Sequence, residues 1–197
     1  RIRVFFLINK KSCIISSSVI TSFLLFFYFI YYEGNNESAK LWTRYSAHLS
    51  FYYFFLSFAA SSFNSYLGYS FIKTILRNRR YFGISFAIAH SFHLIALTYF
   101  FTVSVEGPSI VSIIGGGAGY LIMYAMAFTS NDRMVKKIGS RKWKLLHKIG
   151  SSYLAIIFIY AFIFGFLFSE YRMLYGFYIL LIFTVYSIKF FKKINIA

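Results

Sequence analysis

Acidic residues are scarce in this sequence, which has 197 residues with five Asp and Glu against 21 Lys and Arg. None of the five lies inside a long apolar run. Proton-coupled transporters and pumps commonly rely on carboxylates within the membrane, so this absence disfavours a proton-driven carrier. The sequence also offers no carboxylate pair and no Ser, His and Asp set that would indicate intramembrane hydrolysis.

Cysteine and proline occur once each, as Cys13 and Pro108. A single cysteine leaves no disulfide framework and says nothing about redox compartment. Apolar residues are abundant instead, because 59% of the chain is hydrophobic and 24% is aromatic. This composition is unlike that of a soluble domain and indicates an integral membrane protein in contact with lipid.

Apolar runs of about twenty residues, the length that crosses a bilayer, predict six transmembrane helices. Their ranges are 13–32, 46–72, 82–103, 109–129, 145–168 and 171–190. The connecting segments are too short to form a folded domain. We therefore expect an all-α fold, a single six-helix transmembrane bundle over residues 1–197.

The first apolar run, 13–32, resembles a signal peptide only superficially. Its apolar stretch is too long, and no small-residue cleavage site follows before the polar stretch EGNNES. We therefore expect a membrane span rather than a removable leader. The sequence begins with Arg1 rather than methionine, so it does not establish where the natural chain starts.

The formal net charge of +16 is unevenly distributed, and its distribution argues against nucleic acid as a partner. Basic residues gather at both ends and in two alternate loops, 73–80 and 133–148, whereas the other loops carry most of the acidic residues. This is the positive-inside pattern, and it predicts that both termini are cytoplasmic. The residues involved are Arg1, Arg3, Lys10, Lys11, Lys189, Lys192 and Lys193 at the ends, with Glu33, Glu37, Glu106 and Glu170 in the opposite loops.

His90 and His93 lie in the middle of an apolar helix, in the stretch YFGISFAIAHSFHLIALTYFFTV from Tyr81 to Val103. An ionisable side chain at this depth is costly and usually marks a functional site. Their i,i+3 spacing puts both on one helix face, and imidazole is a common ligand of haem iron and other metals. The alternative for either residue is a hydrogen-bonded histidine that only packs helices together.

Small residues accompany the histidines. Gly83 and Ala87 share the His90 side of the helix, where they would leave room for a flat macrocycle. His147 opens a second stripe that also contains small residues and ends at Gly165. For His48 and His147, contact with lipid headgroups is as good an interpretation as ligation. The glycine run 115–119 follows no strand, so it indicates close approach to a helix or a flat ligand rather than a Rossmann loop.

Two stretches resemble the ferric-reductase-like transmembrane family. The first is Arg79-Arg80-Tyr81-Phe82-Gly83 with His93 ten residues after the glycine, which is similar to the third helix of that family. The second is Thr129-Ser130, a basic loop, and then Trp143-Lys144-Leu145-Leu146-His147-Lys148, which resembles the W-x-x-L-H-R/K start of the fifth helix. Within the family, the likeness is to the haem-binding membrane subunit of the bacterial protein-methionine-sulfoxide reductase system, and it covers roughly residues 45–190.

The resemblance implies a membrane electron carrier that binds haem b. It leaves open whether one or two haems are bound and whether a flavin is bound as well. It puts His93 and His147 at haem-binding positions of the family. The family has another histidine thirteen residues after the one that matches His147, and here that place is Tyr160. Tyrosine can ligate haem iron, but it disfavours the bis-histidine state of a simple electron carrier.

Helix depth leaves the pairing of ligands open. At 1.5 Å per residue, His93 lies roughly 18–20 Å above the inner end of its helix, whereas His147 lies about 5 Å into its own. These two residues are therefore an awkward pair on one iron. His48 enters from the outer side nearer the level of His93, and His90 lies one turn closer to His147.

The resemblance also implies partners and a location. Electrons would come from a cytoplasmic flavoprotein or a quinol and pass to an outer-side acceptor, in the bacterial branch a periplasmic reductase, across the bacterial inner membrane. The basic residues Arg79, Arg80, Lys144 and Lys148 are either partners of haem propionates or ordinary topology residues. The competing hypothesis is a haem-free membrane scaffold or assembly partner with the same fold. A channel or carrier is a third class, which the lack of acidic residues disfavours.

Overall fold

The structure, a computed structural model, describes residues 2–32, 35–104 and 107–194, and for residues 2–10 and 193 it describes the backbone alone. Several residues of the charge pattern therefore lie outside the described residues or side chains. They are Arg1, Arg3, Lys10, Glu33, Glu106 and Lys193.

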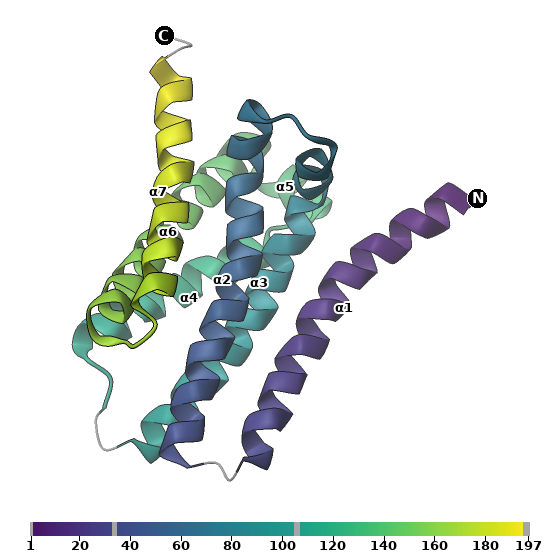
Figure 1. Cartoon of the computed structure of the whole chain (residues 1–197). Coiled ribbons are helices and arrows are strands. Elements are labelled where there is room, and N and C mark those ends of the chain that lie inside the picture. The colour runs from purple at the N-terminus through teal and green to yellow at the C-terminus, as the bar shows by residue number, and fades with distance from the viewer. Residues whose placement is uncertain (1, 33–34, 105–106, 195–197) are drawn as a thin grey trace. The chain divides into compact units, whose positions relative to one another are not determined.

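The described part of the chain is helical and contains no strand, as expected for an all-α fold. The elements follow one another along the chain in Figure 1. They are α1 (Ile2–Tyr31), α2 (Asn36–Tyr66), α3 (Ser70–Val103), the π-helical turn η1 (Ser112–Gly116), α4 (Gly117–Phe128), α5 (Asp132–Ile138), α6 (Ser140–Phe168) and α7 (Arg172–Ile194).

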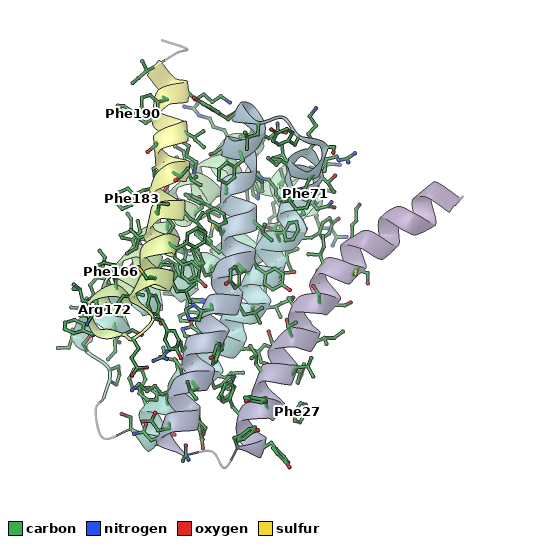
Figure 2. All side chains as sticks on the ribbon, viewed as in Figure 1. Phe27, Phe71, Phe166, Arg172, Phe183 and Phe190 are labelled. Carbon is green, nitrogen blue, oxygen red and sulfur yellow. The ribbon has the colours of Figure 1, made fainter. Side chains whose placement is uncertain are left out.

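Four helical segments among the described residues are long and apolar enough to cross a membrane: Lys11–Tyr31, Ser70–Val103, Ser140–Phe168 and Arg172–Lys192. A fifth is reached if Ser112–Phe128 and Asp132–Ile138, bent by 104°, form one broken span. Several long apolar helices identify an integral membrane protein in contact with lipid. In Figure 2, Phe183 and Phe190 on α7 point away from their helix, and both side chains are exposed.

The predicted helix over 46–72 matches α2 in existence but not in extent, and α2 does not qualify as an apolar span. Part of its polarity is buried, since Ser46, Ser50 and Ser62 are all buried, and Glu37, Lys40 and Arg44 add charge near its start. A helix whose polar groups are buried against a neighbour can be long without being apolar throughout.

The boundary between the second and third helices was predicted wrongly. Residues 73–80, expected in a loop, belong to the first turns of α3, and α2 ends at Tyr66 rather than at Ile72. Gly68 adopts φ +61, the left-handed conformation that commonly terminates a helix. The basic residues then continue as helix, because lysine and arginine are good helix formers even outside an apolar run.

Other helix ends also extend beyond the apolar runs. α1 begins at Ile2 and α6 at Ser140, earlier than the predicted starts at 13 and 145. The predicted loop 133–148 contains a short helix, α5, that begins where the Asn131 side chain accepts a hydrogen bond from Met134 N at 2.8 Å. Gly139, with φ +87, then separates α5 from α6.

The chain divides into two compact units. Unit 1 comprises residues 1–57 and 77–113, and unit 2 comprises 58–76 and 114–197. In unit 1, α1 packs on α2 through Phe26 and Trp42, whose ring centroids lie 5.3 Å apart, and on α3 through Phe23 and Phe92, 5.0 Å apart. In unit 2, α6 is central and packs against α4, α5 and α7.

Candidate functional site

The two histidines of α3 are both held by serines of α2, within unit 1. His93 Nδ1 lies 3.0 Å from Ser46 Oγ, and His90 Nδ1 lies 3.0 Å from Ser50 Oγ. The two helices run antiparallel, so a step of four residues on α2 matches a step of three on α3 in the opposite direction. The structure thereby brings two of the expected site residues together and gives each the same kind of partner.

These contacts are part of a polar stripe along α2. Thr43 Oγ1 donates to the carbonyl of Ala96 at 3.2 Å, and Ser57 Oγ donates to the carbonyl of Arg79 at 3.1 Å. With Ser46 and Ser50 between them, the four hydroxyls follow the spacing that keeps residues on one helix face. The stripe ties α2 to α3 along the apolar part of α3, where each unmade polar bond would be costly.

Each of the two central serines also bonds to its own helix. Ser46 Oγ donates to the carbonyl of Thr43 at 3.0 Å, and Ser50 Oγ donates to the carbonyl of Ala47 at 2.9 Å. Both serines are buried, with relative exposures of 2% and 0%. Their hydroxyls are therefore fixed on two sides and cannot rotate freely.

The rings of His90 and His93 contact each other, with centroids 5.1 Å apart and planes inclined by 34°. Phe86, one turn away, packs on His90 at 5.2 Å. Two rings that contact each other on one helix face cannot lie on opposite faces of one macrocycle. Each iron could therefore take at most one of these two residues as an axial ligand.

His48 lies on α2 in the same unit and is buried, with 9% of its surface exposed. Its ring is 6.4 Å from that of Tyr45, and Ser46, two residues earlier on α2, contacts His93. The expectation that His48 approaches the level of His93 agrees with this placement. Its ring lies inside the helical unit, so contact with headgroups alone does not describe it.

His147 lies in unit 2 and is held differently. Its ring packs against that of Trp143 one turn earlier, with centroids 4.3 Å apart. Trp143 Nε1 donates at 3.0 Å to the carbonyl of Thr129, which caps the C-terminal end of α4. The W-x-x-L-H pattern therefore fixes the start of α6 to the end of α4, with the histidine ring against the indole.

Tyr160, at the family position of a further ligand, lies on the exposed face of α6. Its side chain is 43% exposed and packs on Phe164 at 5.0 Å. Thirteen residues at 100° each separate His147 and Tyr160 by about 140° around the helix axis. The two side chains therefore do not share a face, and on this helix they could serve only different haems.

The expected room beside the small residues differs between the two stripes. A Cβ added at Gly83 in unit 1 would meet only Ser57 Oγ, at an ordinary 3.5 Å. A Cβ added at Gly165 in unit 2 would lie 2.7 Å from the Tyr175 ring, and one at Gly150 would lie 2.7 Å from Met126 Sδ. Side chains of α7 and α4 thus fill the space beside these two glycines of α6.

The glycine run 115–119 spans the end of η1 and the start of α4, with no strand before it. Tyr153 Oη of α6 donates to the carbonyl of Gly115 at 3.0 Å, and a Cβ at Gly119 would meet Leu154 of α6 at 3.7 Å. The run therefore lets α6 approach closely, as expected from its small residues. π-Helical turns of this kind are frequent at functional sites.

No group of three or more His, Cys, Asp or Glu among the described residues could hold a metal ion. Haem makes a smaller demand, because its macrocycle supplies four nitrogen ligands and the protein adds one or two. The chemistry of partly buried imidazoles hydrogen-bonded to buried serines fits that demand in unit 1. His147 and Tyr160 lie in unit 2, and the ligand pairing expected from sequence stays a prediction.

Ser46 and Ser50 were not recognised from the sequence as site residues. A signal existed, because Thr43, Ser46, Ser50 and Ser57 recur at intervals that put them on one face of an otherwise aromatic helix. The signal could not be connected to the histidines without knowing which face of α2 meets α3.

Comparison with known proteins gives one partial relative. A stretch of 83 residues is 30% identical to the magnetosome protein MamZ of Magnetospirillum gryphiswaldense, covering 39% of this chain and 13% of that protein. The chain thus matches only a small part of the relative's length. No family model and no solved structure matches the chain.

Proposed function

We propose that this chain is a haem-b-binding electron-transfer subunit of the membrane, of the ferric-reductase-like kind, with His93 as an axial ligand. The observation that carries the proposal is the pair of partly buried histidines in α3, each within 3.0 Å of a buried serine of α2. A metal-binding histidine almost always donates its second ring N–H to a hydrogen-bond acceptor, which orients the ring.

The surroundings of His93 suit a redox group better than a proton pathway. α3 has no acidic residue, and the nearest polar partners of its histidines are hydroxyls. When bound, haem b supplies reversible one-electron transfer, and the protein contributes ligands, orientation and a dry cavity. His90, His48, His147 and Tyr160 are further candidate ligands, and the demand for one or two protein ligands per iron leaves room for two haems.

The proposed orientation places both termini in the cytoplasm and the protein in the bacterial inner membrane, with six membrane-crossing segments. Support comes from the basic residues at the start of α3 and between α4 and α6, which would all face the inner side. Within this orientation α2 is a sixth span, and its buried Ser46 and Ser50 contact histidines of α3 rather than lipid. The partial relative, a magnetosome protein, comes from a bacterium.

The proposed partners follow from the orientation. Electrons would enter from a cytoplasmic flavoprotein or a quinol and leave to an outer-side reductase. Lys144 and Lys148 are exposed at the start of α6, next to the turn that carries His147. Exposed cations there suit either haem propionates or anionic lipid headgroups.

A haem-free membrane scaffold is the second candidate function, and unit 2 favours it. The ring of Tyr175 fills the space beside Gly165, and Tyr160 sits on an exposed face. A helix packed in this way needs no cofactor to complete its core. The two candidate functions predict different absorption spectra for the purified protein, with haem bands for the electron carrier and none for the scaffold.

The deciding experiment is a dithionite-reduced minus oxidised absorption spectrum of the detergent-purified full chain from a haem-replete host. A sharp b-type difference spectrum supports the electron carrier. A featureless spectrum from folded protein supports the scaffold and overturns the haem proposal. Haem quantified per chain then separates one haem from two.

A further inference from the structure

The serines that back the two histidines constrain more than ring orientation. A serine hydroxyl has one hydrogen to donate and two lone pairs with which to accept. Ser46 and Ser50 each lie within bonding distance of two groups, a backbone carbonyl of their own helix and a histidine Nδ1. A carbonyl can only accept, so the hydroxyl hydrogen decides which arrangement holds.

Two arrangements compete at each serine. If the hydroxyl donates to the carbonyl, the histidine must donate from Nδ1–H to the serine oxygen, and two hydrogen bonds are made. If the hydroxyl donates to Nδ1 instead, the bond to the carbonyl is lost and one remains. One additional neutral hydrogen bond favours the first arrangement by about fivefold, and the chain of two bonds strengthens each of them further.

We propose that Ser46 and Ser50 are positioning residues that hold His93 and His90 in the Nδ1–H tautomer, so that Nε2 of each ring is the metal-directed nitrogen. The tautomer assignment follows from the hydrogen bonds at Nδ1 and does not depend on haem. The statement that Nε2 is directed at iron rests on the proposed haem function.

The matched geometry is what distinguishes this pair from ordinary helix-packing serines. Ser57 and Thr43 lie on the same stripe of α2 but donate to backbone carbonyls of α3. A carbonyl has no tautomers, so these two contacts do not set the position of a ring proton. Both histidines of α3 instead meet a serine whose own donor is already engaged. A repeated two-bond relay on adjacent turns presents two imidazoles with the same nitrogen unprotonated.

The first test uses the full chain, labelled with ¹⁵N-histidine and purified in detergent from a haem-depleted host. The ¹⁵N shifts of each ring separate a protonated, pyrrole-type nitrogen from an unprotonated, pyridine-type nitrogen. We expect pyrrole-type Nδ1 and pyridine-type Nε2 for both His90 and His93. A dominant Nε2–H form in either ring of the wild-type chain would overturn the proposal for that ring.

Variants assign the effect to each serine. Ser46→Ala should shift the tautomer ratio of His93 toward Nε2–H by about fivefold, and Ser50→Ala should do the same for His90. Ser57→Ala is the matched control, since it removes a hydroxyl from the same stripe and should move neither ring. Ser46→Thr keeps the hydroxyl and should preserve the wild-type shifts. Unchanged shifts in both alanine variants contradict the positioning role.

The second test uses the haem-loaded chain. Loss of a hydrogen-bonding partner of a ligand histidine typically weakens metal affinity by roughly 10–100-fold, and we expect haem loss of this size in Ser46→Ala but not in Ser57→Ala. The midpoint potential of retained haem should rise in Ser46→Ala, because a less basic imidazole stabilises Fe(III) less. If the haem affinity and the midpoint potential of Ser46→Ala both equal those of the wild type, the claim that Nε2 of His93 is directed at iron is rejected.

The two tests separate the inference from the proposed function. A chain that holds no haem but shows Nδ1–H in both rings refutes the haem proposal and retains the tautomer assignment. A chain that binds haem while His93 carries its proton on Nε2 in the haem-depleted form refutes the tautomer assignment and retains the haem proposal.

Discussion

The two compact units of this chain hold their histidines in different ways. In unit 1, His90 and His93 are bonded through Nδ1 to buried hydroxyls of a neighbouring helix. In unit 2, the ring of His147 packs against the indole of Trp143 on its own helix. The glycines differ too, since Gly83 has room beside it and Gly165 has none.

The contacts of His90 and His93 orient their rings through hydrogen bonds, whereas the contact of His147 with Trp143 is one of ring packing. A hydrogen bond to Nδ1 fixes both the direction of the ring and the nitrogen that carries the proton. Ring stacking fixes a position but not a protonation state. Unit 1 therefore carries the stronger structural case for a ligand, although the family resemblance treats His93 and His147 alike.

Replacing His93 should produce the largest effect and tests this asymmetry directly. In His93→Ala, bound haem should fall by more than the roughly 10–100-fold that loss of an outer partner costs, because the ligand itself is gone. His147→Ala should cost less if unit 1 dominates binding. The measurement is haem per chain from the reduced spectrum after purification.

Ser91→Ala is the control for this comparison, because Ser91 lies on the same helix and bonds to the carbonyl of Ala87. It should leave haem content unchanged. Full haem in His93→Ala would remove His93 as the main ligand. A greater loss in His147→Ala than in His93→Ala would reverse the ranking of the two units.

Alanine at the two glycines should separate the tight unit from the roomy one. Gly165→Ala should destabilise the protein by about 1–3 kcal/mol, because its Cβ would meet the buried Tyr175 ring at 2.7–2.8 Å. Gly83→Ala should be neutral or stabilise by up to about 1 kcal/mol, since the new Cβ has an ordinary contact and alanine is the better helix former. Thermal unfolding in detergent, followed by circular dichroism, measures both. A larger loss in Gly83→Ala would show that unit 1 is the tighter one.

The sequence predicted the helical class and the long apolar segments of α1, α3, α6 and α7, because burial in lipid demands an apolar run of fixed length. It misplaced the helix ends, because hydropathy reports where lipid begins and not where a helix does. α2 ends at Tyr66, just before Gly68 and six residues before the predicted end at Ile72. α3 begins at Ser70, so the basic residues from Lys73 onward belong to its first turns. The helix α5 went unrecognised although Asn131 and Gly139 are ordinary start and stop signals.

The candidate site was predictable only in part, for a different reason. His90 and His93 stand out because an ionisable group in an apolar run is rare. Ser46 and Ser50 do not stand out, because serine is common in this chain and its partner is set by which helix faces meet. Likewise, nothing in the residues around Gly165 signals that an aromatic ring of α7 occupies the space beside it.

A smaller effect is expected from the indole that supports His147. Trp143→Phe keeps a ring to pack against His147 but removes the hydrogen bond from Nε1 to the carbonyl of Thr129. Loss of one such bond should lower the free energy of unfolding by about 0.5–1.5 kcal/mol. If stacking is what holds His147, haem content should stay near wild type while thermal stability drops. Trp143→Leu, which removes the aromatic ring as well, is the companion variant that should affect both.

The smallest difference should come from two tyrosines, one in each unit. Tyr153→Phe removes a hydroxyl that donates to the carbonyl of Gly115 at 3.0 Å, at the π-helical turn of unit 2, and should cost about 0.5–1.5 kcal/mol. Tyr53→Phe removes a contact of 3.1 Å with Ser17 in unit 1, but Ser17 keeps its own bond to the carbonyl of Ile14, so little is left unmade. Its cost should be at most about 0.5 kcal/mol. If the two variants lose equal thermal stability, the bond from Tyr153 does not stabilise the π-helical turn more than an ordinary contact would. The two units would then differ only in how they hold their histidines and in the space beside their glycines.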